Sequence, residues 1–493
     1  MSGIIAVRQL PLPKTTESTQ EGSAVVRNSR SSFALFFGNR GFFPSSLIAE
    51  ARQTLAQRLY EWGYGAIMLD ENATRHGAVE TPTEGEKYAN FLRENRGRYD
   101  GVILCLPNFG DETGAVAALG EAGVPILIQA YPDELDKMRP ELRRDSFCGK
   151  FSIMDVFCQY GVKFTALKPH TVHPGSPRFA GNLEYFDRLC RVVKRMKAFT
   201  VGAIGARTTA FKTVRVDELA LQRHGITVET TDLSDLFARM SALGSDDAAV
   251  REKAERLREY TNWDGVPDQA RDKLAKMGVA IDQVVSEYRM NAVAIRCWIE
   301  MQKQLGISPC VLLSEMNDRG VVAACEVDIG NAVSMYGLSG ASGDVATCLD
   351  WNNNYGEDDE RCILFHCGPV PQRLMTGKGK VTDHAILANA VGVGCGYGCN
   401  TGRIRAGQIT FSSMITESGK LQFYLGEGEF TEDPIPADFF GCAGVARIPR
   451  LQDVLQTVGY AGHRHHVGVT PGHVAAPVHE AMVKYLGYEV TRV

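Results

Sequence analysis

The sequence contains no long hydrophobic run, because none of its 493 residues lies in a stretch of 18 or more apolar side chains. A helix needs about 20 mainly apolar residues to cross a bilayer, so we expect no membrane span and no membrane partner. Residues Met1 to Val25 are polar after Ile5 and lack the apolar centre of a secretory signal peptide. We therefore expect a cytoplasmic protein.

An excess of positive charge is also absent. The chain has 53 Lys and Arg against 58 Asp and Glu, which gives a net charge of −5. Proteins that bind nucleic acid normally carry a basic face, so nucleic acid is not the expected partner. The remaining composition, 44% hydrophobic and 23% charged, is that of an ordinary soluble enzyme, and the length suggests about three domains.

Several catalytic signatures are missing as well. The sequence has no P-loop and no G-x-S-x-G elbow, and the glycine-dense run Gly392 to Gly398 does not complete a G-x-G-x-x-G fingerprint. We therefore expect no dinucleotide site, and we interpret these glycines as turn or packing residues. The 13 cysteines are scattered, which favours buried free thiols in a reducing compartment. Cys362 to Cys367 and Cys395 to Cys399 lack the paired spacing of a zinc ribbon, which argues against structural zinc.

Strand and helix patterns alternate along most of the chain, which predicts parallel sheets with helices on their faces. The alternation runs through 32–37, 45–62, 65–69, 84–94, 101–106, a helix after Asp111, and 124–129, and a second series opens at 198–204. After about residue 355 the sequence becomes rich in glycine and in strand-forming residues. We predict an α/β protein with an N-terminal arm (1–30), two Rossmann-like parallel-sheet domains (31–175 and 176–355), and a smaller, mostly β C-terminal domain (356–493).

Three short apolar runs in the second half each end on a residue that can bind a metal. They lead into Glu326, Asp350 and His366. Loops at the carboxyl ends of strands in an open α/β sheet meet at one crevice. The 24 residues from Glu326 to Asp350 fit one strand, one helix capped by Asp328, and the next strand, so we expect the two carboxylates on adjacent parallel strands about 4.8 Å apart. The pattern predicts a site for a small cation.

Each of these residues has a structural alternative. A single carboxylate at a strand end is often a helix cap or half of an ion pair, but clustered carboxylates repel unless a cation or a proton neutralises them. The segment 462–473 adds four histidines, His463, His465, His466 and His473, any one of which alone is more often structural than functional. Carboxylate oxygens with imidazole suit Mn²⁺, Co²⁺, Fe²⁺ or Mg²⁺.

The stretches ACEVDIGNA (324–332), TCLDWNNNY (347–355), LFHCGP (364–369) and HHVGVTPGHV (465–474) resemble the L-fucose isomerase and L-arabinose isomerase group. The resemblance implies that Glu326, Asp350 and His466 bind Mn²⁺, or another divalent metal such as Co²⁺ or Mg²⁺, with His366 as a further ligand. His465 and Val467 stand where the fucose isomerase pattern has Asn and Gly, so His465 stays an alternative to His466.

The resemblance also implies an activity, a metal-dependent interconversion of a free aldose and its ketose, such as L-fucose or D-arabinose, through an enediol. Glu326 and Asp350 would be the catalytic pair. It further implies a homo-oligomer, a hexamer or an assembly of trimers, whose active site lies at a subunit interface reached by Arg40. Trp351 and Asn353 are further candidates for sugar contacts. Two alternatives stay open: an isomerase of an anionic hexose such as sulfoquinovose, and a non-catalytic sugar-binding or regulatory protein.

Overall fold

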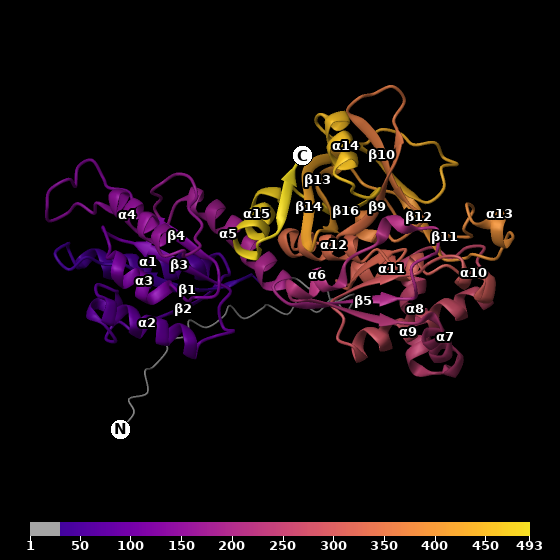
Figure 1. The fold of residues 1–493 in the computed structure, drawn as a ribbon, viewed down its shortest axis with the longest axis horizontal. Coiled ribbons are helices and arrows are strands. Elements are labelled where there is room, and N and C mark those ends of the chain that lie inside the picture. The colour runs from indigo at the N-terminus through magenta and orange to yellow at the C-terminus, as the bar shows by residue number, and fades with distance from the viewer. Residues whose placement is uncertain (1–29) are drawn as a thin grey trace. The chain divides into compact units, whose positions relative to one another are not determined.

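The computed structural model describes residues 30–493, so the predicted N-terminal arm lies outside the described residues except for Arg30. The described chain forms two compact units, residues 30–194 and residues 195–493 (Figure 1). Among the described residues, no helix combines the length and the apolarity needed to cross a membrane.

The first unit is a four-stranded parallel sheet in the order β2-β1-β3-β4, with helices between the strands. Its strands are β1 (Ser32–Phe37), β2 (Gly65–Met68), β3 (Gly101–Leu106) and β4 (Ile126–Ala130). Its helices are α1 (Ser46–Glu61), α2 (Pro82–Glu94), α3 (Glu112–Leu119), α4 (Ser146–Gln159) and α5 (Pro177–Met196), the last ending just beyond the unit. Every residue of β3 is buried, as expected for a central strand of a parallel sheet that is covered on both faces. The alternation predicted for this region is confirmed.

The second unit begins with another four-stranded parallel sheet, in the order β6-β5-β7-β8. Its strands are β5 (Phe199–Ile204), β6 (Ile226–Thr231), β7 (Ala292–Ile295) and β8 (Val322–Cys325). The helices of this region are α6 (Glu218–Arg223), α7 (Leu233–Ala242), α8 (Ala248–Tyr260), α9 (Asp268–Glu287), α10 (Glu300–Leu305), α11 (Cys310–Asp318) and α12 (Ile329–Ser342). Side chains of α7, α9, α11 and the sheet form one continuous apolar core.

A nine-stranded sheet completes the second unit, in the order β11-β12-β15-β10-β9-β16-β13-β14-β17. Its strands are β9 (Thr347–Asn354), β10 (Arg361–His366), β11 (Lys380–Thr382), β12 (Cys399–Arg403), β13 (Gly407–Glu417), β14 (Lys420–Phe430), β15 (Cys442–Arg447), β16 (His466–Pro471) and β17 (Glu489–Arg492). The helices of this region are α13 (Ala388–Val391), α14 (Leu451–Tyr460) and α15 (Ala475–Glu480), and α15 continues into a π-helical turn at 481–486. The central strands β10, β9, β16 and β13 are antiparallel to one another.

The prediction that Glu326 and Asp350 end adjacent strands of one parallel sheet is wrong. Glu326 follows β8 at the edge of the parallel sheet, whereas Asp350 lies in β9, in the middle of the nine-stranded sheet. The strand-helix-strand spacing was correct, but spacing does not determine which partner a strand finds. Here β9 pairs antiparallel with β16 on one side and β10 on the other, so its hydrogen bonds are satisfied in the large sheet.

Candidate active site

Glu326 stands at a sharp turn directly after β8. Its φ is 62° and that of Val327 is 59°, in the left-handed region that residues other than glycine rarely adopt. Such positions cost of order 1–3 kcal/mol and persist only where the surroundings impose them. The backbone N–H of Val327 donates to Ile295 O at 3.3 Å, and that of Asp328 donates to Cys325 O at 3.0 Å. These bonds fix the turn that presents the Glu326 carboxylate.

Asp350 and His466 are direct cross-strand partners in β9 and β16. Side chains opposite each other in an antiparallel pair have Cβ atoms about 5 Å apart, so this register alone brings a carboxylate beside an imidazole. His366 ends β10, where the preceding residue, Phe365, is paired with Asp350. Three adjacent strands of the large sheet therefore bring Asp350, His366 and His466 together.

The two carboxylates converge on one nitrogen of His466. Nε2 of His466 lies 3.0 Å from Glu326 Oε2 and 3.4 Å from Asp350 Oδ1. Neither His466 Nε2 nor Asp350 Oδ1 makes a hydrogen bond of normal geometry, although both atoms are buried. Two carboxylate oxygens and an imidazole nitrogen that face one another in this way fit a hard or borderline divalent cation.

The opposite nitrogen of His466 is held by Asp328. Nδ1 lies 2.8 Å from Asp328 Oδ2, and the other oxygen of Asp328 is paired with Arg464, with both side chains of that ion pair fully buried. Asp328 Oδ1 also accepts the N–H of Asn331, so the predicted cap of α12 is confirmed. An Nδ1–H that donates to Asp328 leaves Nε2 as the free ligand atom, the arrangement found behind many metal-bound histidines.

The electrostatics of the pocket favour the ionised form of Glu326. Burial raises the pKa of Glu326, but the hydrogen bonding and charge of His466 outweigh burial and hold that pKa below its usual value. Burial lowers the pKa of His466, yet Cys348, Asp328 and Glu326 together raise it above its ordinary value. The acids around His466 thus favour positive charge at its Nε2, as a cation held there would supply.

The two neighbouring histidines differ from His466 in burial and in hydrogen bonding. The side chain of His465 is 44% exposed and its Nε2 lies 3.7 Å from Asp350, so His466 is the better-placed ligand. Nδ1 of buried His366 accepts the backbone N–H of Cys367 at 2.9 Å. Its Nε2 is buried and makes no hydrogen bond of normal geometry, as is the case for His466 Nε2. Ligand atoms of Cys348, His366 and His466 lie within 4.8 Å of one another, so the structure keeps His366 beside His466 as a candidate ligand.

The three predicted sugar contacts lie in different surroundings. Arg40 belongs to the first unit, where its Nε donates to Gly110 O at 2.8 Å and its guanidinium pairs with Glu112. Trp351 is not brought to the site, because its indole packs against Phe411 and donates to Tyr424 Oη at 3.1 Å inside the large sheet. Asn353 is exposed further along β9.

Sequence reasoning missed several residues that shape the pocket. Trp298 Nε1 donates to Glu326 Oε1 at 3.0 Å, and Phe211 packs its ring 5.7 Å from that of His466. Neither residue carries a local sequence signal. Arg464 lies inside the histidine-rich segment, and Asp328 was recognised only as a cap, because its second role depends on a strand 138 residues away.

Two protein-family models match the chain. The model of the N-terminal domain of fucose/sulfoquinovose isomerases matches residues 34–197, and the model of the C-terminal domain of L-fucose isomerases matches residues 364–493. The chain belongs to the L-fucose isomerase-like family. The first match covers the parallel sheet of the first unit, and the second covers most of the large sheet, including His366 and His466.

Curated relatives of this family member are sulfoquinovose isomerases. The enzyme of Priestia aryabhattai is 25% identical over 431 residues, which is 86% of this chain and 92% of that one. The enzyme of Alkalicoccus urumqiensis is 26% identical over 295 residues, which is 59% of this chain and 64% of that one. Family and relatives make the chain an aldose–ketose isomerase.

Solved structures resemble the chain only weakly. A solute-binding protein of Burkholderia multivorans is 10% identical and covers 64% of this chain and 95% of its own, with a TM-score of 0.17. At that score the likeness says nothing about fold or ligand.

Proposed function

We propose that this isomerase interconverts sulfoquinovose, a hexose that carries a sulfonate group, and the corresponding ketose. The relatives that cover most of the chain, such as the Priestia aryabhattai enzyme, are named for that substrate, and this observation carries the proposal. An uncharged aldose such as L-fucose is the second candidate, because the C-terminal family model is that of L-fucose isomerase.

The chemistry rests on the convergence of Glu326 and Asp350 at His466 Nε2. A divalent cation such as Mn²⁺, Co²⁺ or Mg²⁺, held by these three residues, would polarise the carbonyl and hydroxyl oxygens of an open-chain sugar. Glu326 and Asp350 take the proton from C2 and return it to C1, passing through an enediol of the sugar. Trp298 orients Glu326, and the lowered pKa of Glu326 keeps it ionised and ready to accept a proton.

The sulfonate needs a cationic partner, and Arg40 is the residue that we propose. Its guanidinium stacks on the Phe109 ring at 4.5 Å and its side chain is 27% exposed, so the group is both oriented and accessible. The family resemblance supports a neighbouring subunit as the donor of Arg40 to each active site, within a homo-oligomer of six or of trimers. A cytoplasmic location belongs to the same proposal, since all 13 cysteines are free.

A sugar screen with the Mn²⁺-loaded enzyme tests the substrate. We expect kcat/KM for sulfoquinovose to exceed that for D-glucose, the same sugar without the sulfonate, by about 10- to 100-fold, the effect of one charge-assisted contact. A larger kcat/KM for L-fucose than for sulfoquinovose would overturn the proposed substrate in favour of the second candidate.

Exchange in D₂O tests the catalytic pair. Glu326→Gln and Asp350→Asn should each lower the rate of deuterium entry at the transferred position by about 100- to 10,000-fold, the range of general acid–base catalysis. Glu360→Gln, at an exposed carboxylate of the same unit, is the matched control and should leave the rate unchanged. Chelator should abolish turnover and Mn²⁺ should restore it. Normal exchange in both site variants would refute the mechanism.

A further inference from the structure

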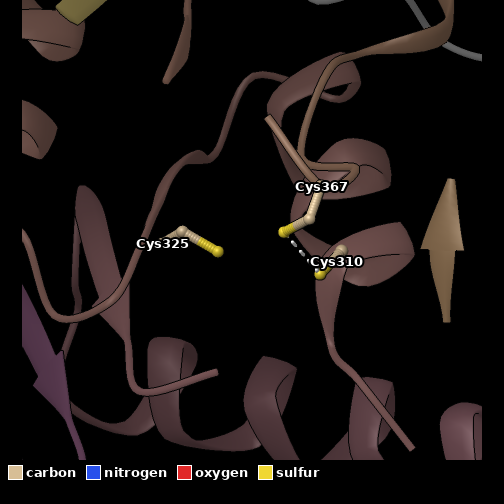
Figure 2. Close-up of side chains that lie close together, drawn as sticks. All are labelled: Cys310, Cys325 and Cys367. Carbon is tan, nitrogen blue, oxygen red and sulfur yellow. Dashed lines mark hydrogen bonds between the residues drawn. The ribbon is translucent and has the colours of Figure 1, made fainter. Parts of the chain in front are cut away.

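Half of the ten buried cysteines of this chain gather at one place in the second unit. Cys310 begins α11, Cys325 ends β8 and Cys367 follows β10, and their side chains point toward one another (Figure 2). The Sγ atoms of Cys310 and Cys367 lie 3.4 Å apart, and all three sulfurs lie within 4.8 Å of one another. Two more buried thiols adjoin them, Cys399 beside Cys310 and Cys367, and Cys297 beside Cys325.

We propose that Cys310, Cys325 and Cys367 form a binding site for a thiophilic d¹⁰ cation of the Zn²⁺ or Cu⁺ class. In a zinc site each sulfur lies about 2.3 Å from the metal, so bound sulfurs are about 3.8 Å apart. The observed spacing needs only small movements to reach that value. Three sulfurs suit trigonal Cu⁺, and Cys399, which adjoins Cys310 and Cys367, would have to move toward Cys325 to become the fourth ligand that tetrahedral Zn²⁺ prefers.

Burial alone does not distinguish this group, because its five cysteines belong to the apolar core around the parallel sheet just as Cys362 and Cys442 belong to that of the large sheet. What distinguishes it is that three sulfurs from segments far apart in the sequence lie within 4.8 Å of one another, which apolar packing does not require. Glycines permit their approach: a Cβ at Gly368 would meet Asn400 N at 2.4 Å, and one at Gly398 would meet Ser308 O at 1.9 Å. The backbone beside Cys367 and Cys399 is thus built for close contact.

The cysteine cluster is joined to the candidate active site through neighbouring residues in the chain. Cys325 immediately precedes Glu326, and Cys367 immediately follows His366. On binding, the three thiols lose their protons to solvent and three sulfur–metal bonds form. These bonds tie the end of β8 to the end of β10, which belong to different sheets. The ion would therefore fix the two backbone segments that carry Glu326 and His366.

Cadmium titration of the full chain, stripped of metal and kept reduced, tests the site. We expect the ultraviolet charge-transfer absorption of cadmium thiolates to saturate at about one ion per chain. Cys310→Ser and Cys367→Ser should weaken cadmium binding by about 100-fold or more, because each removes a direct ligand. Cys362→Ser and Cys442→Ser are the matched controls and should retain the absorption. A variant with both Glu326→Gln and His466→Ala should also retain it, which separates this site from the proposed active-site metal.

A second measurement uses the wild-type chain alone and covers the case in which the variants do not fold. In partial denaturant, cadmium should slow the alkylation of Cys310, Cys325 and Cys367, mapped by mass spectrometry, but not that of Cys362 and Cys442. Metal analysis of protein from zinc- and copper-supplemented cells then distinguishes the two ions. Absence of the charge-transfer band, a band unchanged in Cys310→Ser, or equal alkylation with and without cadmium would each overturn the proposal.

Discussion

Acidic side chains lie beside both ring nitrogens of His466, with Asp328 at Nδ1 and Glu326 and Asp350 at Nε2. The carboxylate of Asp328 therefore fixes both the orientation and the tautomer of the ring. Arg464 neutralises Asp328 from the far side, and this support is possible because Gly330 leaves room: a Cβ there would lie 2.5 Å from the guanidinium. The chemistry at Nε2 of His466 thus depends on the buried ion pair of Asp328 and Arg464 on the Nδ1 side of the ring.

The buried ion pair of Asp328 and Arg464 should contribute to stability as well as to the position of His466. Asp328→Asn should lower the free energy of unfolding by about 3–5 kcal/mol, because it leaves the Arg464 charge buried without a counterion. Adding Arg464→Met should recover most of that loss while the activity stays low, since His466 has still lost its acceptor. Urea unfolding of both single variants and the double variant checks the cycle. Additive losses would show that the two side chains do not act as a pair.

Lys150 gives a prediction of pH dependence within the first unit. Burial lowers the pKa of Lys150 from 10.5 to about 8, although its Nζ donates to His170 O at 2.8 Å. Between these two values the unfolded chain binds a proton that the folded chain does not, so this residue makes stability rise with pH from 8 to 10.5. Below pH 8 the Lys150 ammonium is charged in both states, and its burial lowers the free energy of unfolding by about 3 kcal/mol relative to its value above pH 10.5.

Comparison of the wild type with Lys150→Met isolates this contribution, because every other titrating group is common to both chains. The stability of the variant relative to the wild type should fall by about 2–3 kcal/mol between pH 7 and pH 10, measured by denaturant unfolding at each pH. A difference that stays constant with pH would mean that Lys150 keeps its ordinary pKa in the folded chain.

At the scale of elements, the loops after β1 and β3 depend on how closely α4 approaches them. Gly149 in α4 packs against the loop that follows β3, where a Cβ would meet Phe109 O at 2.0 Å. The same loop holds Arg40, through Gly110 O and the stacking on Phe109. A glycine in the first turn of α4 is thus required by a neighbouring loop and indirectly by a proposed substrate contact.

Two glycine-to-alanine changes in helices of the first unit should have opposite effects. Gly149→Ala should destabilise the unit by about 1–3 kcal/mol, since the added methyl group cannot be accommodated. Gly181→Ala in α5, where nothing lies within 4 Å of the added Cβ, should stabilise it by up to about 1 kcal/mol through helix propensity. Thermal unfolding of the two variants provides the comparison. Stabilisation by both changes would disprove the tight approach of α4 to the loop.

The elements themselves were largely predictable, and their partners were not. The apolar runs gave β1 and β3 with their observed bounds, because central parallel strands are buried on both faces and have a clear sequence pattern. The pattern also found β8 and β9, but it placed them in one sheet. The spacing of a strand, a helix and a second strand does not determine which strand the second one pairs with. The strand that pairs with β9 is β16, which begins more than a hundred residues later.

At the scale of the whole molecule, membership of the L-fucose isomerase-like family raises the question of which subunit completes each active site. In our proposal Arg40 and Glu326 of one site come from different chains. The single variants Arg40→Gln and Glu326→Gln should then both be nearly inactive. Co-assembly of the two should restore roughly one site in four, because random mixing gives that share of sites with both native residues.

The recovered activity is measured on co-expressed subunits carrying different tags, with the separately purified variants mixed without exchange as the control. Size-exclusion chromatography with light scattering gives the number of subunits. Activity of the co-assembled chains no higher than that of the unexchanged mixture would place Arg40 and Glu326 of each site in the same chain.

The sequence by itself determined the strand end that carries Glu326, the cap at Asp328 and the class of chemistry, because each follows from local periodicity or from a short motif, but it placed Asp350 at the end of a strand when that residue lies inside β9. Only the tertiary structure decided that Asp350 lies opposite His466 in a large sheet, that Asp328 and Arg464 support His466 at Nδ1, and that Cys310, Cys325 and Cys367 come within 4.8 Å of one another. Cysteine spacing argued against a thiolate metal site, since spacing rules recognise ligands that are close in sequence. The physical reason is the same in each case: strand pairing brings together residues whose separation along the chain leaves no periodic trace.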